Sequence, residues 1–346
     1  MKGSDVQGTP REQFDAAREV ERLSGWIRAS VQQSLKKRGV VIGLSGGIDS
    51  AVVAALSVKA LGAGRVVALG LPERDSSPQS LVLARELAER LGIEFGVEDI
   101  TAGLEGMGAY RRRDEAVRRL FPDYEPGMPF KITLQSTPLA DNRLNVFSLT
   151  LIHAGGEEES KRLGPQEYSQ IVAASNMKQR LRMTMLYYHA ERRNYAMAGT
   201  GNKNEHEMGF FVKHGDGGAD LMPIIHLFKT QIYMLAHALE IPAAIIERAP
   251  TTDTYPAEVT QEEFFFRIPF GVMDAIWQES ENGATPEELA VRFALAPEQV
   301  ERVVADIRSK KNGTAFLRMP ALRFDSLAHE AAAAGSEELG RSGRTA

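Results

Sequence analysis

The stretch "VVIGLSGGIDSAVVAALSVKAL", residues 40–61, decides the fold of this chain. It begins with an apolar run suited to a buried strand and ends with an apolar run suited to a buried helix. The turn between them, "SGGIDS", contains two adjacent glycines, which let the backbone approach a ligand without a Cβ in the way. Because a helix N-terminus also offers free N–H groups to an anion, the stretch predicts a strand, a phosphate-binding loop and a helix.

Asp49 is the unexpected member of this turn, because a carboxylate repels phosphate. A divalent cation between the two would resolve the conflict, and Mg²⁺ takes oxygen ligands and bridges to phosphates. A plain turn with an acid near a helix start is the simpler interpretation, and two glycines alone would favour it. The complete string between a strand and a helix favours phosphate, although it lacks the spacer and the lysine of a Walker A loop.

Composition and charge narrow the class of protein. The 346 residues are 43% hydrophobic and 25% charged, which suits one large α/β domain or two small ones. A net charge of −5 argues against a nucleic-acid binder. The absence of cysteine excludes disulfides, thiolate-bound metals and a cysteine nucleophile. The N-terminus has no apolar core like that of a signal peptide, and the most apolar stretch, 51–71, contains Lys59 and Arg65, so we expect a cytoplasmic protein without a membrane span.

Strands and helices alternate on both sides of a central interruption. Strands are expected at 40–44, 65–71, 93–100 and 195–199, and helices at 11–38, 50–61, 78–91, 176–194, 229–239 and 242–248. This rhythm predicts an α/β fold with a doubly wound, mainly parallel sheet.

Residues 101–172 break the rhythm and are predicted to form an inserted β-hairpin, followed by a polar loop at 154–166. Residues 262–311 are predicted to be helical, with breaks near Gly283 and Pro297. We expect one domain over residues 1–325 and a disordered tail over 326–346, where Ala, Gly, Ser and Glu predominate.

Two separated motifs carry a resemblance to a known family. "LSGGIDS", residues 44–50, resembles the pyrophosphate loop of the N-type ATP pyrophosphatases, which have an adenine nucleotide alpha hydrolase-like fold. "NMKQRLRMTMLYYHAERRNYAMAGTGNKNEHEMGFFVKHGDGGADLMPI", residues 176–224, is similar to ammonia-dependent NAD synthetase. The resemblance covers about 11–100 and 175–255, and it implies a ligase that adenylates a carboxylate and amidates it with ammonia.

The resemblance implies three sets of site residues. Those for ATP are Gly43, Leu44, Ser45, Gly46, Gly47, Ile48, Asp49, Ser50, Thr200, Lys229 and Thr251, with Asp253 beside the last. Those for the dinucleotide substrate are Arg180, Lys213 and Asp220. The resemblance implies three catalytic residues, Asp49, Glu205 and Lys229, of which Asp49 and Glu205 would bind Mg²⁺. Considered one at a time, Lys229 would be a surface lysine and Glu205 an exposed acid in a first helical turn.

Other features concern partners and metals. Because the chain lacks cysteine and has no room for a glutaminase domain ahead of Ser45, ammonia would arrive free or from a separate glutaminase partner. The resemblance implies a homodimer. His189, His206 and His214 lack regular metal-ligand spacing and are interpreted as structural or exposed.

Two segments depart from the family pattern and leave the substrate open. Residues 101–172 are longer than their counterpart, and Ala315 and Phe316 stand where the family places a His-Lys or Tyr-Lys pair. Deamido-NAD is therefore the first candidate substrate, and a different carboxylate in a specialised pathway is the alternative. A non-catalytic nucleotide-binding protein is a further alternative, which Asp49 and Glu205 disfavour. A DNA-binding module at 285–311 is another, which the acidic pI disfavours.

Overall fold

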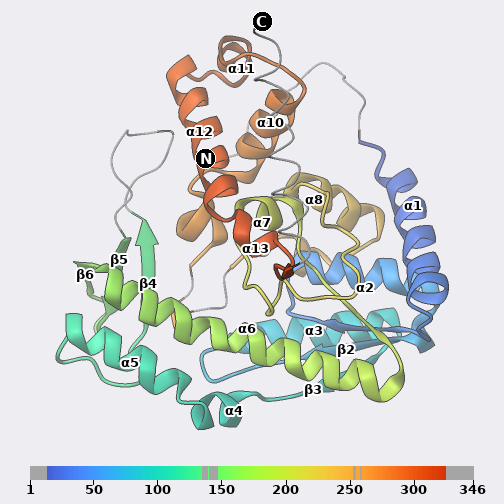
Figure 1. Ribbon diagram of the computed structural model, residues 1–346, viewed down its shortest axis with the longest axis horizontal. Coiled ribbons are helices and arrows are strands. Elements are labelled where there is room, and N and C mark those ends of the chain that lie inside the picture. The colour runs from blue at the N-terminus through green and yellow to red at the C-terminus, as the bar shows by residue number, and fades with distance from the viewer. Residues whose placement is uncertain (1–13, 135–138, 140–146, 252–254, 258, 325–346) are drawn as a thin grey trace, which may run out of the picture.

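A four-stranded parallel sheet forms the centre of the computed structural model, which describes residues 14–134, 139, 147–251, 255–257 and 259–324 (Figure 1). Its strands are β1 (Val40–Gly43), β2 (Val66–Gly70), β3 (Glu94–Val97) and β7 (Ala196–Ala198), in the order β3-β2-β1-β7. Val41 is opposite Val67 on one side and Met197 on the other. The predicted α/β class and parallel sheet are confirmed.

Helices cover both faces of this sheet. One face packs on α1 (Ala16–Ala29), α2 (Ile48–Leu61), α3 (Pro78–Leu91), α8 (Lys229–Ala238) and α9 (Ala243–Ile246). The other face, with Val41 and Leu69, packs on α6 (Pro165–Arg193) through Leu186 and Ala190. Alternate residues of each strand therefore enter different cores, as a sheet buried on both faces requires.

The segment between β3 and α6 differs from its prediction. It contains two helices, α4 (Thr101–Gly106) and α5 (Ala109–Leu120), and an antiparallel sheet of β4 (Phe130–Leu134), β5 (Phe147–Ile152) and β6 (Glu158–Arg162). The hairpin is thus one part of a three-stranded sheet, and α6 begins at Pro165 rather than at 176. In Figure 1, α6 runs from beside this sheet along the molecule to the parallel sheet.

The prediction of a polar loop at 154–166 is wrong because β6 is an edge strand. Most of its side chains are exposed, so it lacks the apolar alternation of a half-buried strand. Cross-strand polar contacts join it to the sheet instead: Lys131 Nζ is 3.0 Å from Glu158 Oε1, and Thr150 Oγ1 is 2.7 Å from Ser160 Oγ.

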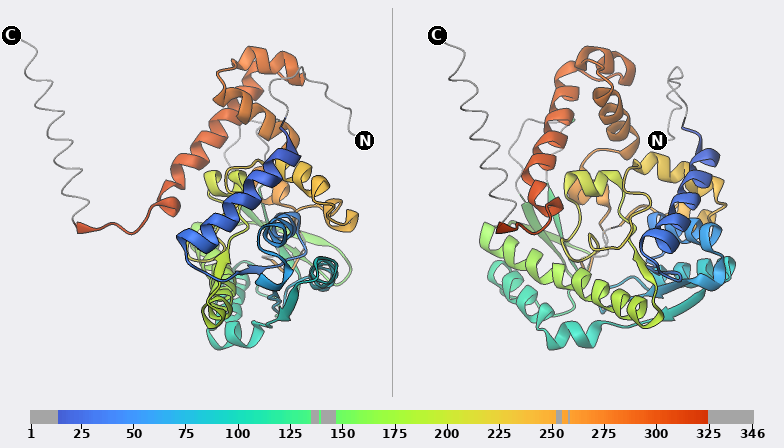
Figure 2. Two further views of the ribbon diagram at one scale, coloured as in Figure 1. Left: turned by 90° about the vertical axis from the view of Figure 1, so that its right-hand side faces the viewer. Right: turned by 45° about the vertical axis from the view of Figure 1, so that its right-hand side comes forward.

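The C-terminal part is helical, as predicted. It comprises α10 (Phe270–Glu281), α11 (Pro286–Phe293), α12 (Pro297–Gly313) and α13 (Ala315–Arg318), and a π-helical turn at Glu262–Phe266 precedes them. These helices have their own apolar core, which includes Met273, Trp277 and Val303. Figure 2 shows α10, α11 and α12, in orange, standing out on the side of the molecule opposite α4 and α5.

Some sequence-based predictions lie outside the described residues: Asp253, the tail 326–346 and most of residues 136–143, which would join the two strands of the predicted hairpin. In the part of the chain that the structure does describe, none of the helices has the length and apolar character that crossing a membrane requires.

Candidate nucleotide-binding site

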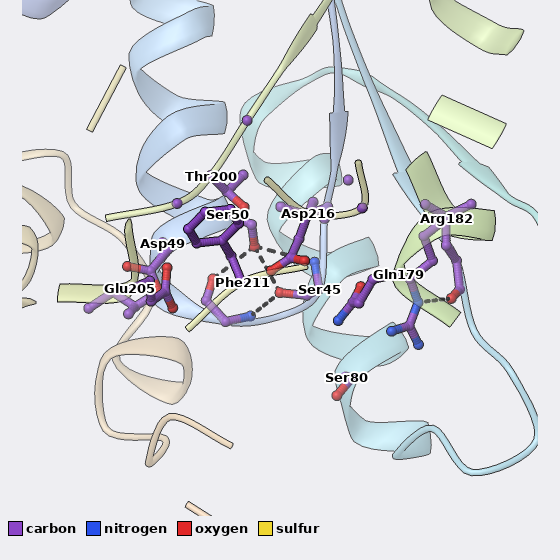
Figure 3. A pocket seen from close by; sticks show the side chains of 18 of the residues that line it. Ser45, Asp49, Ser50, Ser80, Gln179, Arg182, Thr200, Glu205, Phe211 and Asp216 are labelled. Atoms are coloured by element: carbon purple, nitrogen blue, oxygen red, sulfur yellow. Dashed lines mark hydrogen bonds between the residues drawn. The ribbon is translucent and has the colours of Figure 1, made fainter. Parts of the chain in front are cut away.

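The glycine-rich loop leaves the carboxyl end of β1 and enters α2. Leu44 N donates to Leu69 O at 2.9 Å, so the chain follows β2 for one residue beyond the strand. Ser50 Oγ donates to Gly47 O at 3.0 Å and lies 3.3 Å from Ser45 N, which closes the loop on itself (Figure 3). The loop is therefore fixed before any ligand arrives.

Gly46 is the position in this loop that only glycine can occupy. Its φ is +73°, and a Cβ there would lie 2.5 Å from the backbone oxygen of Ser80 in α3. The close approach of the loop to α3 therefore depends on the missing side chain.

We expect Gly46→Ala to unfold more easily than Gly92→Ala. Both glycines have positive φ, at +73° and +65°, but nothing lies within 4 Å of a Cβ at Gly92. A left-handed alanine costs about 1 kcal/mol, and the clash at Gly46 should add about 1–3 kcal/mol and weaken ATP binding. Denaturant unfolding measures the stability of both variants, and ATP titration measures their affinity. Equal losses of stability and affinity in the two variants would contradict the special role of Gly46.

The loop borders a cavity of about 280 Å³ at the carboxyl edge of the parallel sheet. Its wall includes these residues predicted from the sequence: Gly43, Leu44, Ser45, Gly47, Ile48, Asp49, Ser50, Thr200, Glu205, Lys229 and Thr251. In open α/β sheets ligands collect at this edge, because all parallel strands end there. Gly46 shapes the turn without lining the cavity.

Asp49 and Lys229 form an ion pair in the cavity wall, in which Lys229 is buried and Asp49 is partly exposed. Lys229 Nζ contacts Asp49 Oδ2, and Asn202 Nδ2 donates to Asp49 Oδ1 at 3.2 Å. Lys229 is 0% exposed. Burial lowers the pKa of Lys229, but the charges of Asp49 and Glu205 outweigh burial and raise the pKa above its ordinary value. A fixed positive charge therefore lies beside the glycine-rich loop.

Glu205 is placed by the turn that begins α7 (Lys203–Met208). Asn202 caps this helix: Glu205 N donates to Asn202 Oδ1 at 3.0 Å, and Asn202 N donates to Glu205 Oε2 at 3.1 Å. This reciprocal capping box fixes the Glu205 carboxylate in the cavity wall. Figure 3 shows Asp49 and Glu205 next to one another at one end of the site.

Burial, and next the negative charge of Asp49, raises the pKa of Glu205 to about 8 from an ordinary value of 4.5. An acid whose pKa is higher in the folded protein than in the unfolded chain stabilises the fold fully below its unfolded-state pKa. That contribution is lost as pH rises through its folded-state pKa. Without ligands, stability should therefore decrease between about pH 4.5 and pH 8.

We expect Glu205→Gln to flatten this pH dependence and to be more stable than the natural chain at pH 8. Thermal unfolding at pH 5.5 and 8.0, in the presence of a chelator and without ATP, measures the effect. Glu86→Gln, on an exposed stretch of α3, is the matched control and should follow the natural chain. A Glu205→Gln variant that is less stable than the natural chain at pH 8 would disprove the raised pKa of Glu205.

The carboxylates of Asp49 and Glu205 suit a magnesium ion that is shared with substrate phosphates. They are too few for a metal held by protein ligands alone. The residues described in the structure contain no group of three or more His, Cys, Asp or Glu that could hold a metal. Mg²⁺ usually binds one or two carboxylates and completes its shell with water and substrate phosphates. Two neighbouring carboxylates beside a glycine-rich loop at a helix N-terminus fit that pattern.

Sequence reasoning missed the residues at the other end of the cavity. Arg182 Nε donates to Leu71 O at 3.0 Å, and Arg182 Nη2 donates to Ser76 Oγ at 3.2 Å. Arg248 Nη2 donates to Ser80 Oγ at 3.0 Å. Figure 3 shows Arg182 far from Asp49, so these arginines border the cavity at the end away from the two carboxylates. The Arg-x-Arg spacing at 180–182 is the signal in the sequence, and the resemblance points to its first arginine.

The three residues predicted for the dinucleotide substrate do not line this cavity. Arg180 Nε donates to Lys213 O at 3.3 Å, and Lys213 Nζ donates to Phe316 O at 3.0 Å and Met319 O at 2.8 Å. Asp220 Oδ2 accepts a 2.8 Å hydrogen bond from the backbone N–H of Met197 in β7. Arg180 and Lys213 therefore meet beside the C-terminal segment, and Asp220 is tied to the sheet.

The fold and the site together define a class: a doubly wound α/β protein with a glycine-rich loop and two carboxylates at the carboxyl edge of its sheet. The model of the NAD synthase family matches residues 19–119 and 147–314, more than half of the chain. This chain belongs to the NAD synthase family.

Individual relatives agree with this assignment. NH(3)-dependent NAD(+) synthetase of Rhizobium meliloti (strain 1021) is 47% identical over 306 residues, 88% of this chain and 91% of that protein. The protein of the same name from Thermotoga maritima is 37% identical over 283 residues, 82% of this chain and 92% of that protein. Among solved structures, NMN synthetase from Francisella tularensis has a TM-score of 0.59 at 25% identity, covering 90% of this chain and 99% of that one.

Proposed function

We propose that this protein amidates deamido-NAD with ammonia and ATP, giving NAD, AMP and pyrophosphate. The observation that carries the proposal is the phosphate loop with Asp49, Glu205 and buried Lys229 gathered beside it at one sheet edge. The relatives named above support the choice of substrate, because the synthetases that share 37–47% identity over most of this chain are named for NAD.

The reaction needs two displacements. A carboxylate oxygen of the substrate attacks the α-phosphorus of ATP, and the bond to the pyrophosphate breaks. The nitrogen of ammonia then attacks the acyl carbon, the bond to AMP breaks, and the nitrogen loses a proton. Because adenylation creates a good leaving group, the protein contributes mainly positioning and charge stabilisation.

Residues of the chain take these roles in our proposal. The N–H groups at the start of α2 hold the phosphates, with the hydroxyls of Ser45 and Ser50 beside them. Lys229 stabilises the negative charge that develops on the departing pyrophosphate. Thr200 and Thr251 contact ATP from neighbouring segments of the wall. Asp49 and Glu205 hold Mg²⁺, which when bound supplies Lewis-acid stabilisation of phosphate oxygens.

Arg180, Lys213 and Asp220 hold the dinucleotide in our proposal, with the two basic residues suited to its phosphates or carboxylate. Ammonia enters free or is supplied by a separate glutaminase, because the chain contains no cysteine to release it from glutamine. We further propose a homodimer, which sedimentation of the full chain tests.

The experiment that tests the function is a substrate panel. The protein is incubated with ATP, Mg²⁺, ammonium and either deamido-NAD or the carboxylate counterpart of NMN, since one structural neighbour is an NMN synthetase. We expect NAD and AMP in equal amounts with deamido-NAD and at least a tenfold lower kcat/KM with the mononucleotide. The reverse preference would establish the alternative substrate, and nucleotide binding without turnover would establish a non-catalytic protein.

A further inference from the structure

Gln261 is a buried side chain at the candidate metal end of the cavity and has no role in the proposed reaction. It is 9% exposed, and its Nε2 donates to Glu205 Oε1 at 3.2 Å. Its carbonyl oxygen Oε1 has no hydrogen-bond partner among the described residues. A buried carbonyl without a partner destabilises a fold, and a leucine of similar size would avoid that loss. Such a residue is expected where function requires it.

The contact completes the hydrogen bonding of the Glu205 carboxylate. Asn202 N donates to Oε2 at 3.1 Å and Gln261 Nε2 to Oε1 at 3.2 Å, so each oxygen has one fixed donor. Two donors from different segments fix both the position and the rotation of the carboxylate plane. Without Gln261, the carboxylate would keep one donor and could rotate away from Asp49.

Gln261 belongs to what we call the crossing segment, residues 255–257 and 259–266, which passes between the antiparallel sheet and the C-terminal helices. At one end, the Tyr255 ring lies 6.1 Å from that of Phe130 in β4, and Ala257 N donates to Phe130 O at 3.2 Å. This end is therefore anchored on the inserted sheet.

The middle and far end of the crossing segment are anchored as well. Gln261 N donates to Pro250 O at 2.8 Å, next to an antiparallel bridge between Thr251 and Thr260. The ring of Phe265 stacks on that of Phe210 at 4.7 Å, and Phe210 N donates to Glu205 O at 2.7 Å. Gln261 thus reaches Glu205 from a braced segment, as positioning groups require.

From this geometry we infer that Gln261 is a positioning residue that holds the Glu205 carboxylate toward Asp49 for cation binding. The inference rests on the proposed function, since it assigns Glu205 to the cation. It also gives the inserted antiparallel sheet a role, because Phe130 in β4 anchors one end of the crossing segment. Partners that orient metal ligands typically contribute 10–100-fold to metal affinity.

The test measures Mn²⁺ binding by electron paramagnetic resonance, with the full chain and α,β-methylene ATP, which cannot be cleaved between the α and β phosphates. Gln261→Leu is expected to weaken Mn²⁺ binding about tenfold and to leave the unfolding temperature of the ligand-free protein unchanged or higher. Gln299→Leu is the matched control. Its amide is bound at both ends, to Leu139 O at 2.6 Å and Ala296 N at 2.8 Å, so this variant should lose stability and keep Mn²⁺ affinity.

A double variant decides whether Gln261 acts through Glu205. Gln261→Leu added to Glu205→Gln should weaken Mn²⁺ binding no further than Glu205→Gln alone. An additional tenfold loss would overturn the positioning role, and so would a Gln261→Leu variant with natural Mn²⁺ affinity. If the natural chain forms NAD and binds Mn²⁺ while Gln261→Leu matches it, only this inference fails. If the natural chain does neither, the proposed function fails with it.

Discussion

Replacing Lys229 with methionine is expected to lower kcat for NAD formation by about 10³-fold. The ammonium group is the buried positive charge beside the glycine-rich loop, and loss of one preorganised group that stabilises transition-state charge typically costs 10²–10³-fold. The variant should also unfold more easily, because removing one partner of a buried ion pair costs about 3–5 kcal/mol. Steady-state kinetics and denaturant unfolding measure the two effects.

A second variant separates catalysis from stability. Lys229→Met combined with Asp49→Asn removes both charges of the pair, so most of the lost stability should return while activity stays low. Activity of Lys229→Met within tenfold of the natural chain would contradict the catalytic role. Recovery of activity in the double variant would show that the ion pair serves the fold alone.

Asp49→Asn is expected to lower kcat/KM by about 10²–10³-fold at ordinary Mg²⁺ concentrations. Asparagine keeps the size of the side chain but loses the negative charge that would hold the cation against the phosphates. The variant should also unfold more easily, because buried Lys229 loses its charged partner, although Asn202 can still donate to the side-chain oxygen at position 49. Activity should rise again as Mg²⁺ is increased, which a titration at fixed ATP measures.

Asp15→Asn is the matched control for this substitution. Asp15 caps α1 by accepting from Arg18 N at 3.0 Å, and asparagine caps helices equally well. Its activity and Mg²⁺ dependence should equal those of the natural chain. If Asp49→Asn also has the activity and Mg²⁺ dependence of the natural chain, our assignment of the metal site is wrong.

Local signals explain the elements that were predicted well from the sequence. The bounds of α3 were predicted at Pro78 and Leu91, because a proline suits a first helical turn and Gly92 ends the helix in a left-handed conformation. The strand, glycine-rich turn and helix at 40–61 were recognisable because an apolar run, two glycines and a second apolar run follow one another directly. These features need no contact between distant residues.

Elements that depend on tertiary context were missed. The edge strand β6 carries charged side chains that resemble a loop until its partner strand is known. Arg182 and Arg180 are two residues apart on α6, and only the packing of that helix decides which one borders the cavity. The contact between Gln261 and Glu205 joins positions 56 apart in sequence, so no short motif could reveal it.

Transfer of an oxygen isotope tests the central claim most directly, since adenylation joins a substrate carboxylate oxygen to the α-phosphorus. Deamido-NAD labelled with ¹⁸O in its carboxylate is incubated with the protein, ATP, Mg²⁺ and ammonium, and the products are analysed by mass spectrometry. We predict that each AMP formed carries one ¹⁸O and that the pyrophosphate carries none. Unlabelled AMP, or label recovered in pyrophosphate or phosphate, would contradict the account.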